Sequence, residues 1–196
     1  MTALTVARSE LVLGGQRSGK SRRAEDLAVA WLAASPAHRG VFVATATAWD
    51  DEMRARIARH RADRAVRLPR MRTVEEPLRL AEALAAHGAP GTLVVVDCLT
   101  LWLTNRMLPA QDNCEENPAD ALEEPGLAAT LSIAIAASPG PVVLVSNEIG
   151  LGVVPMGRPV RAFVDALGRL NQAVAAACDR VTLMAAGLPL ALKDAP

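Results

Sequence analysis

The segment that most constrains the fold of this chain is Gly14-Gly15-Gln16-Arg17-Ser18-Gly19-Lys20-Ser21. It matches the pattern G-x-x-x-x-G-K-[ST], and it lies between a strand-like run at 10–13 and a helix-like pattern at 19–34. In that context the glycines let backbone N–H groups close around phosphate oxygens, and the helix start adds a favourable partial charge. The alternative is a glycine turn that binds nothing. The segment therefore predicts one phosphate-binding loop of the P-loop type.

The side chains at the end of this loop predict a catalytic cation and a metal ligand. The chain has 19 arginines but only two lysines, so a lysine inside the loop indicates a role that the wide guanidinium of arginine cannot fill. We expect Lys20 to bind the outer phosphates and Ser21 to offer its hydroxyl to Mg²⁺. Asp97 ends a second strand-like run, where a carboxylate holds Mg²⁺ directly or through water. For Asp97 the alternative is a helix cap for the segment that begins at Leu99.

Strand-like and helix-like segments alternate along the chain. Strands are expected at 10–13, 41–46, 92–97, 141–146 and 180–184, and helices at 19–34, 50–64, 76–87 and 160–178. The strand-like runs contain few polar residues, as in strands that are covered on both faces. The alternation predicts a single α/β domain over 1–196, with a mostly parallel sheet flanked by helices. The acidic stretch 109–126 is expected to be a mobile loop, with a lid over the site as the alternative.

The composition excludes several classes of protein. The formal net charge is zero, so nothing global predicts a nucleic-acid partner. No apolar run approaches the length of a membrane span, and the start of the chain lacks the pattern of a signal peptide. Cys98, Cys114 and Cys178 show neither a disulfide framework nor a metal-binding spacing. We therefore expect a cytoplasmic protein with reduced thiols.

A basic stretch follows the second strand-like run. Eight arginines and one acid, Asp63, lie between positions 54 and 72. This pattern fits either a solvated helix face or a basic wall for a polyphosphate. Met53, Ile57, His60 and Arg64 share one side of the expected helix. From spacing alone, His60 is a hydrogen-bonded residue of the core or of its rim.

Further motifs follow the loop in order. They are Val43-Ala44-Thr45-Ala46, Asp51-Glu52-Met53, Arg56-Ile57-Ala58-Arg59-His60-Arg61-Ala62-Asp63-Arg64, Arg72-Thr73-Val74-Glu75, Val96-Asp97-Cys98-Leu99-Thr100, Thr104-Asn105, Val145-Ser146-Asn147-Glu148-Ile149-Gly150-Leu151-Gly152-Val153-Val154-Pro155 and Gly168-Arg169-Leu170-Asn171-Gln172. With these motifs the chain resembles the bifunctional adenosylcobinamide kinase / adenosylcobinamide-phosphate guanylyltransferase family of cobalamin biosynthesis. The loop alone indicates only a superfamily, whereas the R-I-x-x-H-x-x-x-R and S-N-E-I-G-x-G patterns are much more specific.

The resemblance implies two reactions. A nucleoside triphosphate, ATP or GTP, phosphorylates the aminopropanol hydroxyl of adenosylcobinamide. GTP then guanylylates the product, through a guanylylated histidine that corresponds to His60. The nucleotide contacts that carry over are Gly14, Gly15, Gln16, Arg17, Ser18, Gly19, Lys20, Ser21, Ala44, Thr45, Ala46, Arg61, Ala62, Asp63, Arg64, Glu75 and Asp97. The implied fold is a RecA-like P-loop sheet in a homo-oligomer, for which a trimer is expected.

Several roles stay open at this level. Asn147 and Glu148 follow a strand end, where α/β sheets bind ligands, although a capping role also fits Glu148. Asn171 and Gln172 fit helix packing and intersubunit contact equally well. Two rival functions remain: another small-molecule P-loop kinase with a structural His60, and a nucleotide-binding switch module with a protein or nucleic-acid partner.

Overall fold

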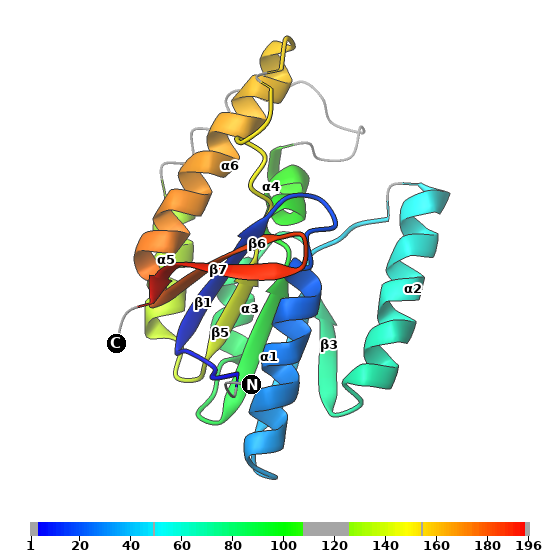
Figure 1. Cartoon of the computed structure of the whole chain (residues 1–196), viewed down its shortest axis with the longest axis vertical. Coiled ribbons are helices and arrows are strands. Elements are labelled where there is room, and N and C mark those ends of the chain that lie inside the picture. Colours follow the sequence, from blue (N-terminus) through cyan, green and yellow to red (C-terminus); the bar gives the residue numbers. More distant parts are fainter. Residues whose placement is uncertain (1–3, 49, 108–125, 154, 195–196) are drawn as a thin grey trace.

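A seven-stranded sheet with the order β3-β2-β4-β5-β1-β6-β7 forms the centre of the molecule (Figure 1). This computed structural model describes residues 4–48, 50–107, 126–153 and 155–194. The strands are β1 (Ser9–Gly14), β2 (Arg39–Ala44), β3 (Met71–Glu75), β4 (Thr92–Asp97), β5 (Val142–Val145), β6 (Arg180–Ala185) and β7 (Leu188–Asp194). The neighbouring strands pair in parallel except for β7, which pairs antiparallel with β6 at one edge.

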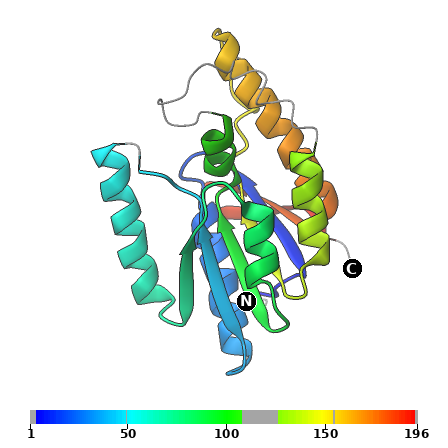
Figure 2. The ribbon, with the colours of Figure 1, turned by 180° about the vertical axis from the view of Figure 1, so that it is seen from behind.

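Helices cover both faces of the sheet. They are α1 (Lys20–Ala34), α2 (Asp51–Arg67), α3 (Leu80–His87), α4 (Leu99–Met107), α5 (Leu127–Ala137) and α6 (Arg158–Ala177). Leu11 and Leu13 of β1 belong to an apolar cluster with α3, α4, α5 and α6, whereas Val12 belongs to a cluster with α1 on the opposite face (Figures 1 and 2). Both faces of the central strands are therefore buried, which explains their continuous apolar runs. The expected fold class, a mostly parallel P-loop NTPase sheet flanked by helices, is confirmed.

Several expected boundaries shift in the structure. The second strand is Arg39–Ala44 rather than 41–46, so Thr45 and Ala46 lie in the connection after it. The second helix runs three residues beyond Arg64, and the third begins at Leu80 rather than at 76. Glu76 instead accepts hydrogen bonds from the N–H groups of Leu78 and Arg79 in a turn before the helix. The long helix is Arg158–Ala177 rather than 160–178.

Two strands were not expected from the sequence. Both β3 and β7 lie at the edges of the sheet, and most of their side chains are exposed. Helix α5 was also missed. The stretch 109–126, expected to be a mobile loop, lies outside the described residues except for Gly126, which precedes α5. In the described ranges no helix is long and apolar enough to cross a membrane.

The strand order brings three segments together at one edge of the sheet. β5 pairs with β4 on one side and with β1 on the other. The carboxyl ends of these parallel strands lead into Asp97, into Ser146–Glu148 and into the glycine-rich loop. Ligands of open α/β sheets bind at such an edge. The site is therefore built from residues that are far apart in the sequence.

Candidate active site

The loop after β1 has the backbone geometry of a phosphate cradle. Gly14 and Gly19 have positive φ angles of 151° and 103°. A Cβ at Gly14 would lie 2.5 Å from the carbonyl oxygen of Met184, and a Cβ at Gly19 would lie 3.3 Å from the Cα of Gly187. The turn between β6 and β7 also braces the loop, because the N–H of Gly187 donates to the carbonyl of Ser18 at 3.0 Å. Both glycines are therefore required by space as well as by conformation.

Lys20 opens α1 directly after Gly19 and is buried. Its Nζ donates to the carbonyl oxygen of Gly15 at 2.6 Å, so the ammonium lies over the loop. Burial lowers the pKa of Lys20, and the charges of Cys98 and Asp97 act in the opposite direction. The hydroxyl of Ser18 is buried without a hydrogen-bond partner among the described residues. The loop thus offers an ammonium and a hydroxyl to an anion, while Gly15, Gln16 and Arg17 are exposed at its tip.

Asp97, at the end of β4, is the point at which the site residues meet. Burial raises the pKa of its carboxyl group, and a hydrogen bond with Ser21 acts against that rise. Electrostatic interactions with His60, Lys20 and Arg64, in that order, also act against the rise of the Asp97 pKa. The contacts of α2 agree with this. Arg64 stacks on Phe42 of β2, the strand that pairs with β4, and Arg67 pairs with Glu25 of α1, so the C-terminal half of α2 lies against β2 and α1.

Helix α2 is fastened to the body by its C-terminal half. Arg64 is buried, and its guanidinium stacks on the ring of Phe42 with 3.7 Å between the guanidinium carbon and the ring centroid. Burial is the main cause of a lowered Arg64 pKa, which the charges of Asp97 and Glu25 oppose. Arg67 forms ion pairs with Glu25 and Asp26 of α1. The helix begins at a cap in which the side chain of Asp50 accepts from an N–H in the first turn.

His60 lies one turn before Arg64 and is exposed. The expectation of a residue of the core or of its rim is therefore wrong for this side chain, because α2 stands at the edge of the molecule (Figure 1). The other two histidines are engaged elsewhere. His38 stacks on Trp31 with the ring centroids 3.7 Å apart, and Nδ1 of His87 lies 3.0 Å from a guanidinium nitrogen of Arg72. Of the three histidines, His60 is the one whose charge acts on Asp97.

The remaining residues expected on α2 and β3 are exposed side chains. Arg61 forms an ion pair with Glu75, and both side chains are about half exposed. Ala62 and Asp63 are exposed on the helix. Cys98 lies next to Asp97, but burial, and secondly the charge of Asp97, raise the pKa of its thiol to about 12. A thiolate nucleophile is therefore not available there at neutral pH.

Thr45 and Asn105 join the ends of β2 and β4. The buried hydroxyl of Thr45 donates to the carbonyl of Cys98 at 2.7 Å and accepts from its N–H at 2.8 Å. The Asn105 amide donates to the carbonyl of Thr45 at 2.7 Å. The side chain of Thr45 therefore positions Asp97 through the backbone. Ala44 and Ala46, on either side of Thr45, are partly exposed.

Replacing Thr45 with valine keeps the shape of the side chain but removes both of these hydrogen bonds. The N–H of Cys98 loses its partner, whereas its carbonyl still accepts from the N–H of Trp102, and the unpaired buried N–H costs about 1–3 kcal/mol. We expect the free energy of unfolding to fall by that amount in a urea titration. Thr45→Ser, which keeps the hydroxyl, serves as the control. An unchanged denaturation midpoint for Thr45→Val would contradict the assigned role.

Hydrogen bonds to α6, to α4 and to the phosphate loop hold the segment 146–148, which follows β5. The buried hydroxyl of Ser146 donates to Asn171 of α6 at 2.7 Å, and the Asn171 amide donates to the carbonyl of Asn147 at 3.0 Å. The N–H of Asn147 donates to the hydroxyl of Thr100 at 2.9 Å. The N–H of Glu148 donates to the carbonyl of Gly14 at 3.1 Å. The first residue of the phosphate loop and the S-N-E pattern therefore form one rigid unit.

Sequence reasoning missed the residues that support the site from a distance. Phe42, Glu25 and Asp26 hold α2, yet none belongs to a motif. The ion pairs of Arg67 span about 40 positions in the sequence, at separations of 42 and 41 residues. No local pattern signals a contact of that kind.

Comparison with known proteins agrees with the motif order. The profile of the family described as cobinamide kinase / cobinamide phosphate guanyltransferase matches residues 10–192. A "Bifunctional adenosylcobalamin biosynthesis protein CobP" of Pseudomonas aeruginosa is 47% identical over 95% of this chain and 98% of its own. A "Bifunctional adenosylcobalamin biosynthesis protein CobU" of Escherichia coli is 38% identical over 93% of this chain and 98% of its own.

Among solved structures, the flagellar accessory protein FlaH of Methanocaldococcus jannaschii covers 97% of this chain and 80% of its own, with 11% identity and a TM-score of 0.49. This likeness is too weak to carry an argument about function. The profile and the two relatives extend over nearly the whole chain, including the loop, the His60 pattern and the S-N-E pattern. The chain therefore belongs to the cobinamide kinase / cobinamide phosphate guanyltransferase family.

Proposed function

We propose that this chain catalyses two successive transfers to one acceptor. In the first, ATP or GTP phosphorylates the aminopropanol hydroxyl of adenosylcobinamide. In the second, His60 takes GMP from GTP and passes it to adenosylcobinamide phosphate, which gives adenosylcobinamide-GDP. The observation that carries the proposal is the placement of the helix that bears His60. Arg64, one turn after His60, stacks on Phe42 of β2, and Arg67 pairs with Glu25 of α1, the helix that the phosphate loop opens.

Both transfers use the same phosphate-binding groups. Lys20 and the backbone N–H groups of the loop hold the outer phosphates of the nucleotide, and the start of α1 adds its partial positive charge. In the kinase reaction the acceptor oxygen bonds to the γ-phosphorus while the bond to the β-phosphate oxygen breaks. In the guanylyl reaction the outer phosphates leave together as pyrophosphate. Holding them in place lowers the barrier of either step.

The guanylyl transfer needs a nucleophile that is accessible and has a free lone pair. A neutral imidazole has one ring nitrogen with a free lone pair, and that nitrogen of the exposed His60 can attack the α-phosphorus. A nitrogen–phosphorus bond forms as the bond to pyrophosphate breaks. A phosphate oxygen of the acceptor then attacks the same phosphorus and releases the imidazole. Arg61 and Arg64, one and four residues further along α2, supply positive charge near this phosphorus.

The residues at the end of β4 fit a magnesium ion. The Ser21 hydroxyl and the Asp97 carboxylate are oxygen donors in hydrogen-bond contact, which are the ligands that Mg²⁺ prefers. The cost of burying the Asp97 charge, seen in its raised pKa, would be offset by a cation beside it. When bound, Mg²⁺ would neutralise charge on the phosphate oxygens. In this proposal Asp97 and Ser21 hold the ion, directly or through water.

The test of the proposed function is incubation of the purified protein with α-labelled GTP, followed by assays of both half-reactions on adenosylcobinamide. We expect label on the protein that resists denaturation, is lost in acid and persists in alkali, as a phosphoramidate does. A different small-molecule kinase would phosphorylate its substrate without acquiring label. A switch module would hydrolyse GTP slowly and neither take up label nor modify the corrinoid.

Asp97→Asn separates the metal role from the capping role. The substitution removes the charge but keeps the shape. We expect the Mg²⁺ concentration for half-maximal activity to rise by about 10- to 100-fold in both half-reactions, because the cation loses an anionic partner. The measurement is a Mg²⁺ titration of initial rates. A variant with an unaltered titration and a lower melting temperature would support the helix cap instead.

The setting of the enzyme is also part of the proposal. We expect a cytoplasmic homo-oligomer, with a trimer as the specific expectation. Nucleic acid is not among the expected partners, because acidic and basic side chains balance to a formal net charge of zero. Sedimentation of the purified protein would measure the oligomeric state.

A further inference from the structure

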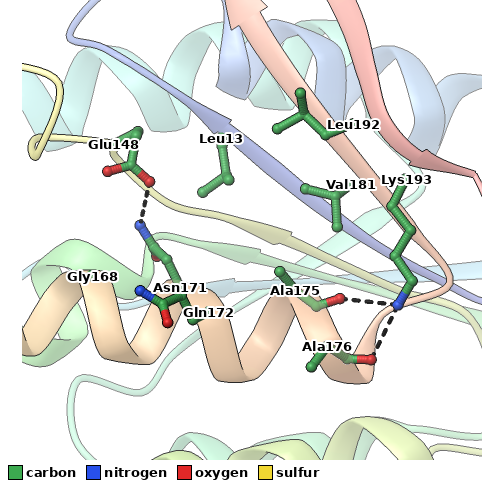
Figure 3. Close-up of a pocket in the computed structure, with 10 residues that line it drawn as sticks. All are labelled: Leu13, Glu148, Gly168, Asn171, Gln172, Ala175, Ala176, Val181, Leu192 and Lys193. Carbon is green, nitrogen blue, oxygen red and sulfur yellow. Dashed lines mark hydrogen bonds between the residues drawn. The ribbon is translucent and has the colours of Figure 1, made fainter.

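A cavity of about 450 Å³ lies between α6 and the strands β1, β6 and β7 (Figure 3). Its walls are mostly apolar and include Leu13, Val181 and Leu192. Polar groups stand at its two ends. Glu148 lies at the end where β5 finishes, next to the phosphate loop, and Lys193 lies at the other end. The Nζ of Lys193 donates to the carbonyls of Ala175 and Ala176, each at 3.1 Å, so this amine caps α6.

We infer that Glu148 binds the acceptor hydroxyl and takes its proton in the kinase reaction, and that the acceptor arm reaches Glu148 through this cavity. The inference deepens the proposed function and rests on it. As the hydroxyl oxygen bonds to the γ-phosphorus, its O–H bond breaks and the proton moves to a carboxylate oxygen of Glu148. The bond between the γ-phosphorus and the bridging oxygen breaks, and the nucleoside diphosphate leaves.

The first reason for this inference is the position of Glu148. Its backbone N–H donates a hydrogen bond of 3.1 Å to the carbonyl of Gly14, the first residue of the phosphate loop. β5, which Glu148 follows, lies between the strand of that loop and the strand of Asp97. The backbone of Glu148 is therefore next to the loop that would hold the phosphates in the proposed function. A kinase must place the acceptor hydroxyl beside those phosphates.

The orientation of the side chain is the second reason. The amide of Asn171 donates to one carboxylate oxygen of Glu148 at 3.4 Å and to the carbonyl of Asn147 at 3.0 Å. Asn171 is itself buried and fixed by Ser146. Asn171 is therefore a positioning residue. It holds Glu148 toward the cavity, as the dashed line in Figure 3 shows.

The other carboxylates near the loop already have hydrogen-bond or ion-pair partners. Asp97 is hydrogen-bonded to Ser21 on the metal side, and Glu75 is paired with Arg61. Glu10, in β1 beneath the loop, is fully buried and bonded to Arg23 and Thr182. Glu148, in contrast, lines the cavity beside α6.

The third reason for this inference is the absence of a side chain at Gly168. It lies in the middle of α6 and lines the cavity, and a Cβ built there would meet nothing within 4 Å. A glycine inside a helix costs roughly 1 kcal/mol relative to alanine. Among the residues that the structure describes, no close contact requires that glycine. A molecule that lies against the helix backbone would explain it.

The first experiment compares Glu148→Gln, Glu148→Asp and the exposed control Asp165→Asn on α6. Each is assayed for adenosylcobinamide phosphorylation and, separately, for labelling by α-labelled GTP. We expect the kinase kcat of Glu148→Gln to fall by about 10²–10⁴-fold, while labelling stays within about threefold of the unmodified protein. Glu148→Asp and Asp165→Asn should keep more of the kinase activity, and formate should restore part of it to Glu148→Ala.

The second experiment fills the cavity from Gly168. Gly168→Leu should raise the KM for adenosylcobinamide by at least about tenfold and leave labelling unchanged, and Gly168→Ala should raise the KM by a smaller factor, because its methyl group occupies less of the cavity. The inference is overturned if Glu148→Gln keeps its kinase kcat within about threefold, if it loses labelling to the same extent, or if Gly168→Leu leaves the KM unchanged. Failure of the unmodified protein to take label or to phosphorylate adenosylcobinamide would instead overturn the proposed function itself.

Discussion

Replacing His60 with alanine is expected to abolish guanylylation while the kinase reaction survives at least in part. The exposed imidazole is the proposed carrier of GMP, and alanine offers no lone pair to the α-phosphorus. Loss of a covalent nucleophile lowers turnover by about 10³-fold or more. Phosphorylation of the hydroxyl needs no such carrier. Labelling by α-labelled GTP, formation of adenosylcobinamide-GDP and formation of adenosylcobinamide phosphate would be measured on the same preparation.

The other two histidines provide matched controls for this experiment. His38 stacks on Trp31, and His87 contacts Arg72, so neither is placed to attack the nucleotide. His38→Gln and His87→Gln should therefore still take up label. If His60→Ala lost both activities equally while folded, the residue would be a binding group rather than a carrier. Undiminished guanylylation in His60→Ala would refute the assignment and direct attention to the two controls.

Replacing Lys20 with alanine should impair both reactions, because both nucleotides need their outer phosphates held. Removal of one preorganised donor to a developing charge costs about 10²–10³-fold in kcat. Lys20→Arg should also be impaired. The site is built for a compact ammonium that lies 2.6 Å from the Gly15 carbonyl, and the planar guanidinium does not match it. Initial rates of each half-reaction, together with the affinity for GTP, would be measured.

The comparison of Lys20→Ala with His60→Ala is informative in itself. The first variant should lose both activities together, whereas the second should separate them. Near-normal turnover of Lys20→Ala in either reaction would exclude a phosphate site shared by both transfers. Lys193→Ala is the matched control, because it removes the other lysine of the chain. That lysine lies at the far end of the Glu148 cavity, so labelling should be unaffected.

Local patterns predicted the parts of the site that are continuous in the sequence. The loop from Gly14 to Ser21 and the strand that ends at Asp97 depend on short-range spacing, and both appear where they were expected. The family assignment, which depends on the order of such motifs, is confirmed by the matches over residues 10–192. The alternation of strands and helices was sufficient to predict a mostly parallel sheet.

Contacts between distant positions could not be predicted in the same way. The hydrogen bonds between the Thr45 hydroxyl and the backbone of Cys98 join residues that are 53 positions apart. The stacking of Arg64 on Phe42 depends on how α2 lies against β2. Helical spacing placed His60 and Arg64 on one side of α2, but it did not predict that Arg64 is buried while His60 is exposed. That difference depends on how far the helix extends beyond the body. The arrangement of elements, rather than the local sequence, decides this.

With only two lysines, the chain has few side chains that react with amine-directed reagents. Each amine donates to backbone carbonyls, Lys20 to Gly15 and Lys193 to Ala175 and Ala176. Nearly all other side-chain cations are guanidinium groups, which acylating reagents modify poorly. An amine-directed reagent therefore meets little competition from the rest of the side chains. Its reaction at Lys20, and the protection of Lys20 by a bound nucleotide, could be followed by peptide mass mapping as a direct measure of how fully the phosphate loop is occupied.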